Sequence, residues 1–112
     1  MNVEELKSVI AERIRIGDET QDEWYDGINA QWEKEIEILS RDMAATINFI
    51  ENDCDDETFY WISEVFEDVA ERTQSKEFLV AITKRAAKVV DPEERRSIET
   101  DVRYASYKFD DD

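Results

Sequence analysis

Apolar residues recur every three or four positions along most of this chain, which is the spacing of one face of an α-helix. A first run covers residues 1–17, ends at Gly17 as a predicted C-cap, and contains Val3, Leu6, Ile10 and Ile14. The longest run covers residues 20–52 and carries a stripe of Trp32, Ile36, Leu39, Met43, Ile47 and Ile50. Because Gly27 and Ser40 interrupt it, we predict an N-terminal helix followed by a long or broken helix.

Helix start signals divide the rest of the chain. Asp55 or Asp56 and then Ser75 are predicted N-caps of a helical hairpin over residues 55–90. Asp91 before Pro92 opens a C-terminal helix over 91–108, and residues 109–112 form an acidic tail that we expect to be solvated. The pattern predicts a single all-α domain, 1–112, of five or so antiparallel helices. An irregular bundle and a short α-solenoid-like stack of helical hairpins both fit it.

Composition supports one folded core and shows where the charge lies. The chain has 112 residues, 41% of them hydrophobic, and a net charge of −16. Ten carboxylates and no lysine or arginine fall between Asp42 and Glu71, whereas residues 76–88 are rich in lysine and arginine, which we expect to pair with the acidic helix. Such a focused negative field favours a cationic partner and argues against direct binding of nucleic acid or an anionic membrane.

A helical wheel of the segment after Asp56 separates an apolar side from an acidic one. The acidic side repeats at Tyr60, Glu64, Glu67 and Glu71, and Trp61 and Asp68 lie on its border. No lysine or arginine stands four residues after Glu64, Glu67 or Glu71, so a partner's basic groups would relieve the repulsion among these carboxylates. A solvated helix face explains the stripe equally, and core burial explains Trp61. The predicted partner-binding residues are Tyr60, Trp61, Glu64, Glu67, Asp68 and Glu71.

Catalytic and metal-binding templates are missing from the sequence. With no histidine and the single Cys54, the chain cannot supply a Ser-His-Asp or Cys-His pair, a Cys/His zinc site or an internal disulfide. It also lacks a glycine-rich phosphate loop. We therefore expect no enzyme activity, no cofactor and no metal. The acidic N-terminus and short apolar runs argue against a signal peptide or a membrane span, so the expected location is the cytoplasm.

Three runs give the chain a family resemblance: residues 59–68 (FYWISEVFED), 73–77 (TQSKE) and 97–101 (SIETD). Over about residues 35–105 the chain resembles small helical immunity proteins of bacterial polymorphic toxin and contact-dependent growth inhibition systems. The resemblance implies a cytoplasmic, non-catalytic antidote that binds one cognate toxin domain with a basic surface, commonly a nuclease. It assigns no role to any individual residue.

Two alternatives from other functional classes also fit the sequence. One is a nucleic-acid-mimicking inhibitor of a host DNA or RNA enzyme, whose carboxylates would imitate a row of phosphates. The other is a helical-repeat adaptor protein, which would hold a peptide in an apolar groove. The oligomeric state is left open by the sequence.

Overall fold

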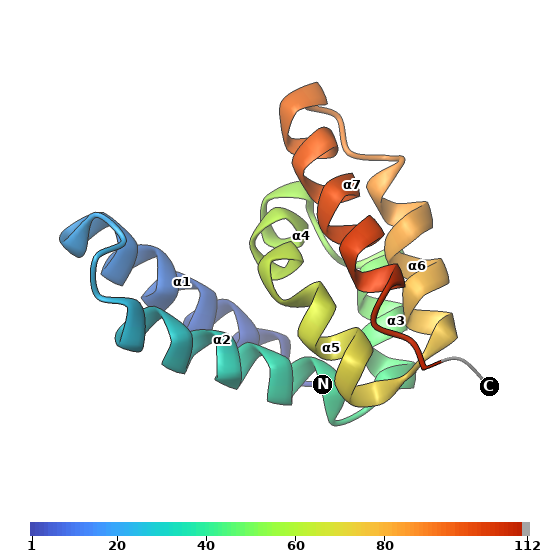
Figure 1. The fold of residues 1–112 in the computed structure, drawn as a ribbon, viewed down its shortest axis with the longest axis horizontal. Helices are drawn as coiled ribbons and strands as arrows, with labels where there is room; N and C mark the ends of the chain where they lie inside the picture. The colour runs from blue at the N-terminus through green and yellow to red at the C-terminus, as the bar shows by residue number, and fades with distance from the viewer. Residues whose placement is uncertain (111–112) are drawn as a thin grey trace.

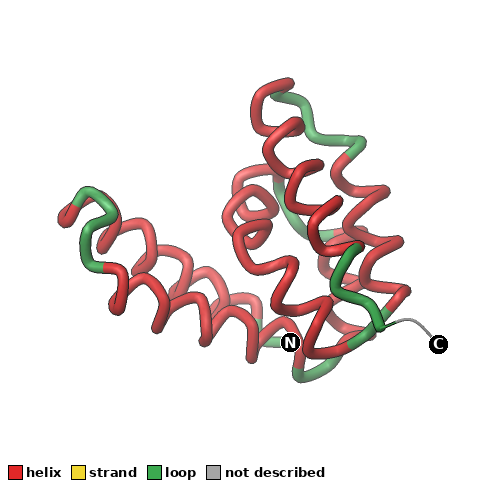
Figure 2. Tube along the Cα trace, in the orientation of Figure 1, coloured by secondary structure: helices red, strands yellow, loops and turns green. Residues whose placement is uncertain are grey.

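The computed structural model describes residues 1–110, which form helices joined by short loops and contain no strand (Figure 2). The elements are α1 (Val3–Thr20), α2 (Tyr25–Ser40), α3 (Met43–Asn52), α4 (Asp56–Ile62), the 3₁₀ turn η1 (Ser63–Val65), α5 (Phe66–Thr73), α6 (Lys76–Ala86) and α7 (Pro92–Ser106). The predicted all-α class is confirmed, with more and shorter helices than expected. Within the described residues, no helix combines the length and the apolar character needed to cross a bilayer.

The helices form an irregular bundle from which one hairpin projects. Helices α1 and α2 pair side by side, and their connection lies at the end farthest from the other helices (Figure 1). In the remaining part, α5 packs on α7, and α6 packs on both α3 and α7. Because these neighbours in space are not all neighbours in sequence, the arrangement fits an irregular bundle better than a stack of consecutive hairpins.

Aromatic residues from three helices form the centre of the core. Phe66 of α5 meets Phe59 of α4 at 5.3 Å and Phe78 of α6 at 5.9 Å between ring centroids, and all three are fully buried. Such pairs contribute about 0.5–1.5 kcal/mol each beyond their buried area. The base of the hairpin joins this core through Leu6, Ile10, Ile38 and Leu39. The hairpin is therefore anchored at its base.

The first helix does not end at Gly17, as the sequence predicted, but continues to Thr20. Its left-handed C-cap is Gln21, with φ of 53°, whereas Gly17 has ordinary helical geometry. Glycine stands at position 17 for a steric reason. A Cβ there would lie 2.5 Å from Nη1 of Arg13 and 2.7 Å from Oδ1 of Asp22. The predicted C-cap was wrong because glycine occurs not only at helix ends but also where neighbouring groups leave no room for a Cβ atom.

Other predicted boundaries also change. The segment 20–52 is broken into α2 and α3, with Asp42 capping α3 through the Ala45 N–H at 3.2 Å. The helix expected to reach residue 90 ends at Ala86. The predicted tail is held as far as Asp110, whose N–H donates to Oε1 of Gln74 at 2.9 Å. Residues 111–112 of that predicted tail lie outside the described residues.

Candidate functional site

The predicted acidic stripe is interrupted by the 3₁₀ turn η1. There the Ser63 hydroxyl donates to the Tyr60 carbonyl at 2.5 Å. A 3₁₀ turn has three residues per turn instead of 3.6, so three such residues rotate the following helix by roughly 60°. Tyr60 and Glu64 thus lose their alignment with Glu67 and Glu71. The prediction of one continuous stripe was wrong because the wheel assumed an unbroken α-helix.

Glu64 is bound inside the molecule instead of standing unpaired. Its two carboxylate oxygens accept hydrogen bonds from Nε and Nη2 of Arg13 in α1, both at 3.0 Å. Oε1 also accepts from the Trp32 indole N–H at 3.1 Å. The Arg13 guanidinium lies 5.4 Å from the Trp61 ring and 5.7 Å from the Trp32 ring. We call Arg13, Trp32, Trp61 and Glu64 the Arg13 cluster; it joins the projecting hairpin to α4 and η1.

A second carboxyl group lies beside the Arg13 cluster. Glu35 of α2 is 1% exposed, and its Oε1 has no hydrogen-bond partner among the described residues. The pKa of Glu35 is raised to about 8, chiefly by burial and then by the charge of Glu64, while Arg13 opposes both effects. Glu35 therefore holds its proton at neutral pH. It contributes a buried acid to this junction and no surface charge.

The remaining predicted residues lie near the end of α7. Nζ of Lys108 approaches a carboxylate oxygen of Glu67 at 3.8 Å and one of Glu71 at 3.9 Å. Between them in sequence is Asp68, whose pKa is raised by partial burial and then by the two neighbouring glutamates. The cation that approaches these two carboxylates is therefore Lys108, which lies outside the segment 76–88 from which we expected the pairing. Tyr60 is half-buried and meets the Trp61 ring edge-on at 5.3 Å.

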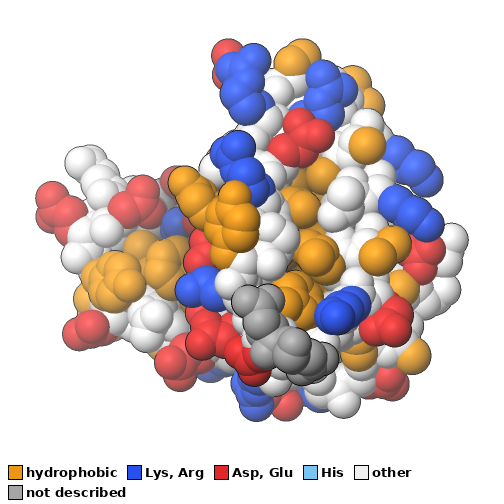
Figure 3. All heavy atoms as spheres, turned by 45° about the vertical axis from the view of Figure 1, so that its right-hand side comes forward, with side chains coloured by type: hydrophobic (Ala, Val, Ile, Leu, Met, Phe, Trp, Pro, Cys, Tyr) orange, Lys and Arg blue, Asp and Glu red, His pale blue; other side chains and the backbone are white. Residues whose placement is uncertain are grey.

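A more exposed acidic and aromatic surface lies at the connection between α1 and α2. We call residues 18–26 the hairpin tip; it holds five carboxylates and no lysine or arginine. Trp24 is 55% exposed and Tyr25 is 64% exposed. In the space-filling view, hydrophobic side chains on the hairpin are framed by carboxylates, at the left (Figure 3). Sequence reasoning missed this site, although two adjacent aromatics within an acidic segment were visible signals.

Both exposed aromatics of the hairpin tip rest on a neighbouring group. A Cβ added to Gly27 would lie 2.4 Å from Cε3 of Trp24, so the indole occupies the space above that glycine. Tyr25 meets the edge of Trp32 at 6.1 Å with an interplanar angle of 80°. Each ring has one supported side and one side open to solvent.

Cations are concentrated on the opposite part of the molecule, over α6 and α7 (Figure 3). The expected pairing with the acidic helix is found for Arg85, whose Nη2 lies 2.6 Å from Oδ1 of Asp56. Among the described residues Lys76, Lys84 and Lys88 form no ion pair. The acidic hairpin tip is thus separated from this chain's own lysine-rich surface.

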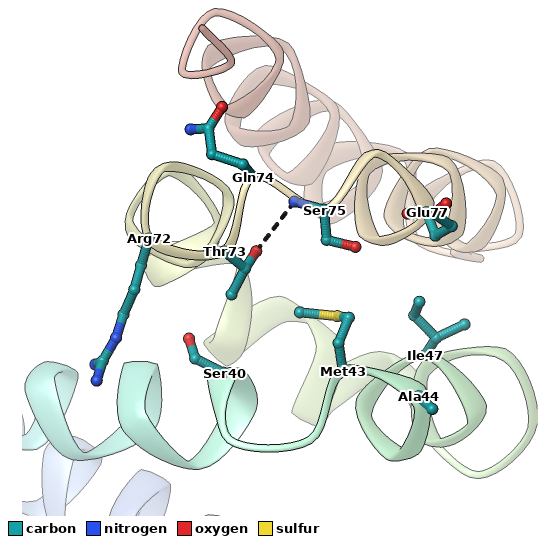
Figure 4. Close-up of a pocket in the computed structure, with 9 residues that line it drawn as sticks. All are labelled: Ser40, Met43, Ala44, Ile47, Arg72, Thr73, Gln74, Ser75 and Glu77. Carbon is teal, nitrogen blue, oxygen red and sulfur yellow. Dashed lines mark hydrogen bonds between the residues drawn. The ribbon is translucent and has the colours of Figure 1, made fainter.

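A hollow of about 730 Å³ lies between the α2–α3 corner and the α5–α6 connection (Figure 4). Met43 and Ile47 provide apolar surface on one side, and on the other the Thr73 hydroxyl accepts from the Ser75 N–H at 3.3 Å. The buried Ser40 hydroxyl at its edge has no partner among the described residues. Nothing in this hollow brings a nucleophile next to a base. Within residues 1–110, no three metal-ligating side chains converge.

Comparisons with protein-family models, curated proteins and solved structures gave no match for this chain.

Proposed function

We propose that this protein is an acidic immunity protein that binds one cognate toxin domain, a nuclease, and covers the toxin's cationic substrate surface. One observation carries the proposal: exposed carboxylates and exposed aromatics share a surface at the end of the α1–α2 hairpin, away from the lysine-rich surface of α6. Aromatic anchors surrounded by polar groups are typical of binding hot spots. A net charge of −16 selects partners of opposite sign.

The chemistry of a nuclease explains why carboxylates suit this task. A protein that cleaves RNA or DNA binds phosphates through lysine and arginine side chains. Carboxylates at the same places satisfy those cations and exclude the substrate. Long-range attraction also raises association rates toward 10⁸–10⁹ M⁻¹s⁻¹ at low salt, as the order of magnitude for steered complexes. Rapid capture is useful to an antidote because the toxin must be blocked before it reaches its substrate.

The surface carboxylates of α5 remain part of this proposal. The contacts from Lys108 to Glu67 and Glu71 are long and partly exposed, and such surface pairs contribute about 0–1 kcal/mol. A partner's arginine can therefore replace Lys108 at little cost. Glu64 and Trp61 have a different role in the proposal, because they hold the hairpin against α4 and η1.

The direct test uses the gene next to the one for this protein. We expect an adjacent reading frame to encode a large secreted protein with a basic C-terminal toxin domain. Co-expression of this protein should prevent killing by that domain, and calorimetry should give a 1:1 complex of nanomolar affinity. A neighbouring toxin that kills equally with and without this protein, and does not bind it, would contradict the proposal.

A further inference from the structure

We infer that the hairpin tip, residues 18–26, is the docking element of this protein, and that its occupant is an arginine- and lysine-lined groove of a partner protein. The inference rests on the proposed function and names the surface that performs it. It replaces the helix face around Glu64 as the main contact, because Glu64 is already bound by Arg13.

The hairpin tip has the shape of an inserted element. It lies at the far end of the α1–α2 hairpin, away from the helices that form the core (Figure 1). A groove can therefore receive it without a collision with the rest of the bundle. Trp24 and Tyr25 are among the most exposed large hydrophobic side chains of the described residues, and they are adjacent. Two neighbouring exposed aromatics are costly to leave in water and gain free energy when a partner covers them.

The aromatic rings are held before a partner arrives. Trp24 is seated over Gly27 and Tyr25 is seated against Trp32. Trp32 is itself fixed, since its indole N–H donates to Glu64. Side chains that are ordered in the unbound protein lose less conformational entropy on binding.

The turn beneath the rings is also fixed. Gln21 and Asp22 both adopt left-handed backbone conformations, with φ of 53° and 62°. Arg13 donates from Nη1 to Oδ1 of Asp22 at 3.2 Å while its other nitrogens bind Glu64. One guanidinium therefore fastens the turn to the body of the molecule, across the space that Gly17 leaves open.

Charge identifies the occupant. Asp18, Glu23 and Asp26 are exposed and form no ion pair among the described residues. Around two aromatic rings, three such carboxylates suit guanidinium groups, which pair with carboxylates and also stack on aromatic faces. An anionic surface, whether nucleic acid or anionic lipid, would be repelled. The competing occupant is the lysine-bearing α6 of a second copy of this chain. Sedimentation velocity distinguishes this self-association from binding to a partner protein.

The experiment titrates deca-arginine, as a model of a basic groove, into the full chain at about 0.15 M salt, where distant charges are screened. Trp24→Ala with Tyr25→Ala should weaken binding about tenfold or more. Tyr104→Ala with Tyr107→Ala removes two exposed aromatics, one from α7 and one from its C-cap, and is the matched control, with binding unchanged within twofold. Equal binding by both double variants would overturn the inference.

A charge series and a structural variant complete the test. The triple change Asp18→Asn, Glu23→Gln, Asp26→Asn should weaken binding several-fold more than Glu51→Gln, Asp53→Asn, Glu57→Gln, which removes the same net charge from another surface. Equal losses of affinity in the two triple variants would show a general effect of net charge and refute a specific role of the hairpin tip.

Gly27→Ala keeps every aromatic residue and favours the helix, but its Cβ displaces Trp24; it should remain folded and bind more weakly. Unchanged binding by this variant would refute the role of the seated indole.

The toxin domain and the assembly state distinguish the remaining outcomes. If the toxin binds wild type and the Trp24→Ala, Tyr25→Ala variant equally well, the hairpin tip is not the docking element, while the proposed function stands. A toxin that fails to bind wild type would refute the proposed function. The deca-arginine titration would still decide whether the hairpin tip binds basic groups. Sedimentation velocity that shows a dimer lost only in the tip variant would assign the tip to self-association and overturn the inference.

Discussion

Glu35 is expected to make the stability of this protein fall as the pH rises from weakly acidic to weakly alkaline. Its folded pKa is about 8 and its ordinary value is 4.5. Between these values the unfolded chain releases the Glu35 proton and the folded protein keeps it. The free energy of unfolding therefore declines by up to about 1.4 kcal/mol per pH unit, and by up to ~5 kcal/mol across the whole interval.

The variant Glu35→Gln removes this titration. A buried amide without a partner costs about 1–3 kcal/mol at every pH, so the variant should be less stable than wild type near pH 5. Because only wild type carries the Glu35 titration, the difference in the free energy of unfolding should move in the variant's favour by about 2–4 kcal/mol by pH 8. Urea unfolding at pH 5, 6, 7 and 8 measures both curves. The chain has no histidine to confuse this interval.

The matched control is Glu33→Gln, which removes an exposed carboxylate from the same helix. Its pH profile should run parallel to that of wild type. The reasoning about Glu35 would be refuted if Glu35→Gln also ran parallel, since that would mean the folded and unfolded states bind the proton equally.

Three further predictions address the parts of the fold around this junction. Glu64→Gln should lower the free energy of unfolding, measured in urea, by about 1–3 kcal/mol, because it weakens a partly buried charged pair with Arg13. Glu67→Gln, the control, should change this free energy by less than about 0.5 kcal/mol. Equal effects of the two variants would contradict the structure. Gly17→Ala should reduce thermal stability despite a better helix propensity, since its Cβ collides with Arg13, and a stabilised variant would show that the guanidinium moves aside easily. Cys54 should react with a thiol reagent at pH 8 far more slowly in the folded protein than in urea, because burial above all raises its pKa to about 12, and equal rates would refute this.

Helix starts could be predicted from the sequence because their determinants are local. The predicted caps at Asp55, Ser75 and Asp91 each accept a hydrogen bond from a backbone N–H two or three residues later. Asp55 is the cap that the sequence could not distinguish from Asp56, which instead pairs with Arg85. Such contacts span one turn of chain, so residue type and spacing are enough to identify them.

The candidate site could not be predicted in the same way, because its contacts join distant parts of the chain. Arg13 and Glu64 are 51 residues apart, and Trp32 is 32 residues from Glu64. A wheel of one helix cannot show that a cation from another helix lies over it. The 3₁₀ turn Ser63–Val65 has the same effect, since it changes the phase of the helix that follows.

The hairpin tip was within reach of sequence reasoning. The largest count of cation-free carboxylates lies between Asp42 and Glu71 and drew the prediction there. Many of those residues are helix caps or pair with Arg13, Arg85 or Lys108 in the fold. The shorter acidic segment at residues 18–26 holds two adjacent aromatics among its carboxylates, and this combination was the better signal.

The most direct test of the account is the association rate between this protein and the basic toxin domain encoded beside it, measured by stopped flow as salt is raised from about 0.05 to 0.5 M. The account predicts a rate near 10⁸ M⁻¹s⁻¹, as an order of magnitude, at the lowest salt and a steep decline as salt screens the carboxylates. A rate that does not change with salt, or no association at all, would contradict the claim that this acidic surface captures a basic partner.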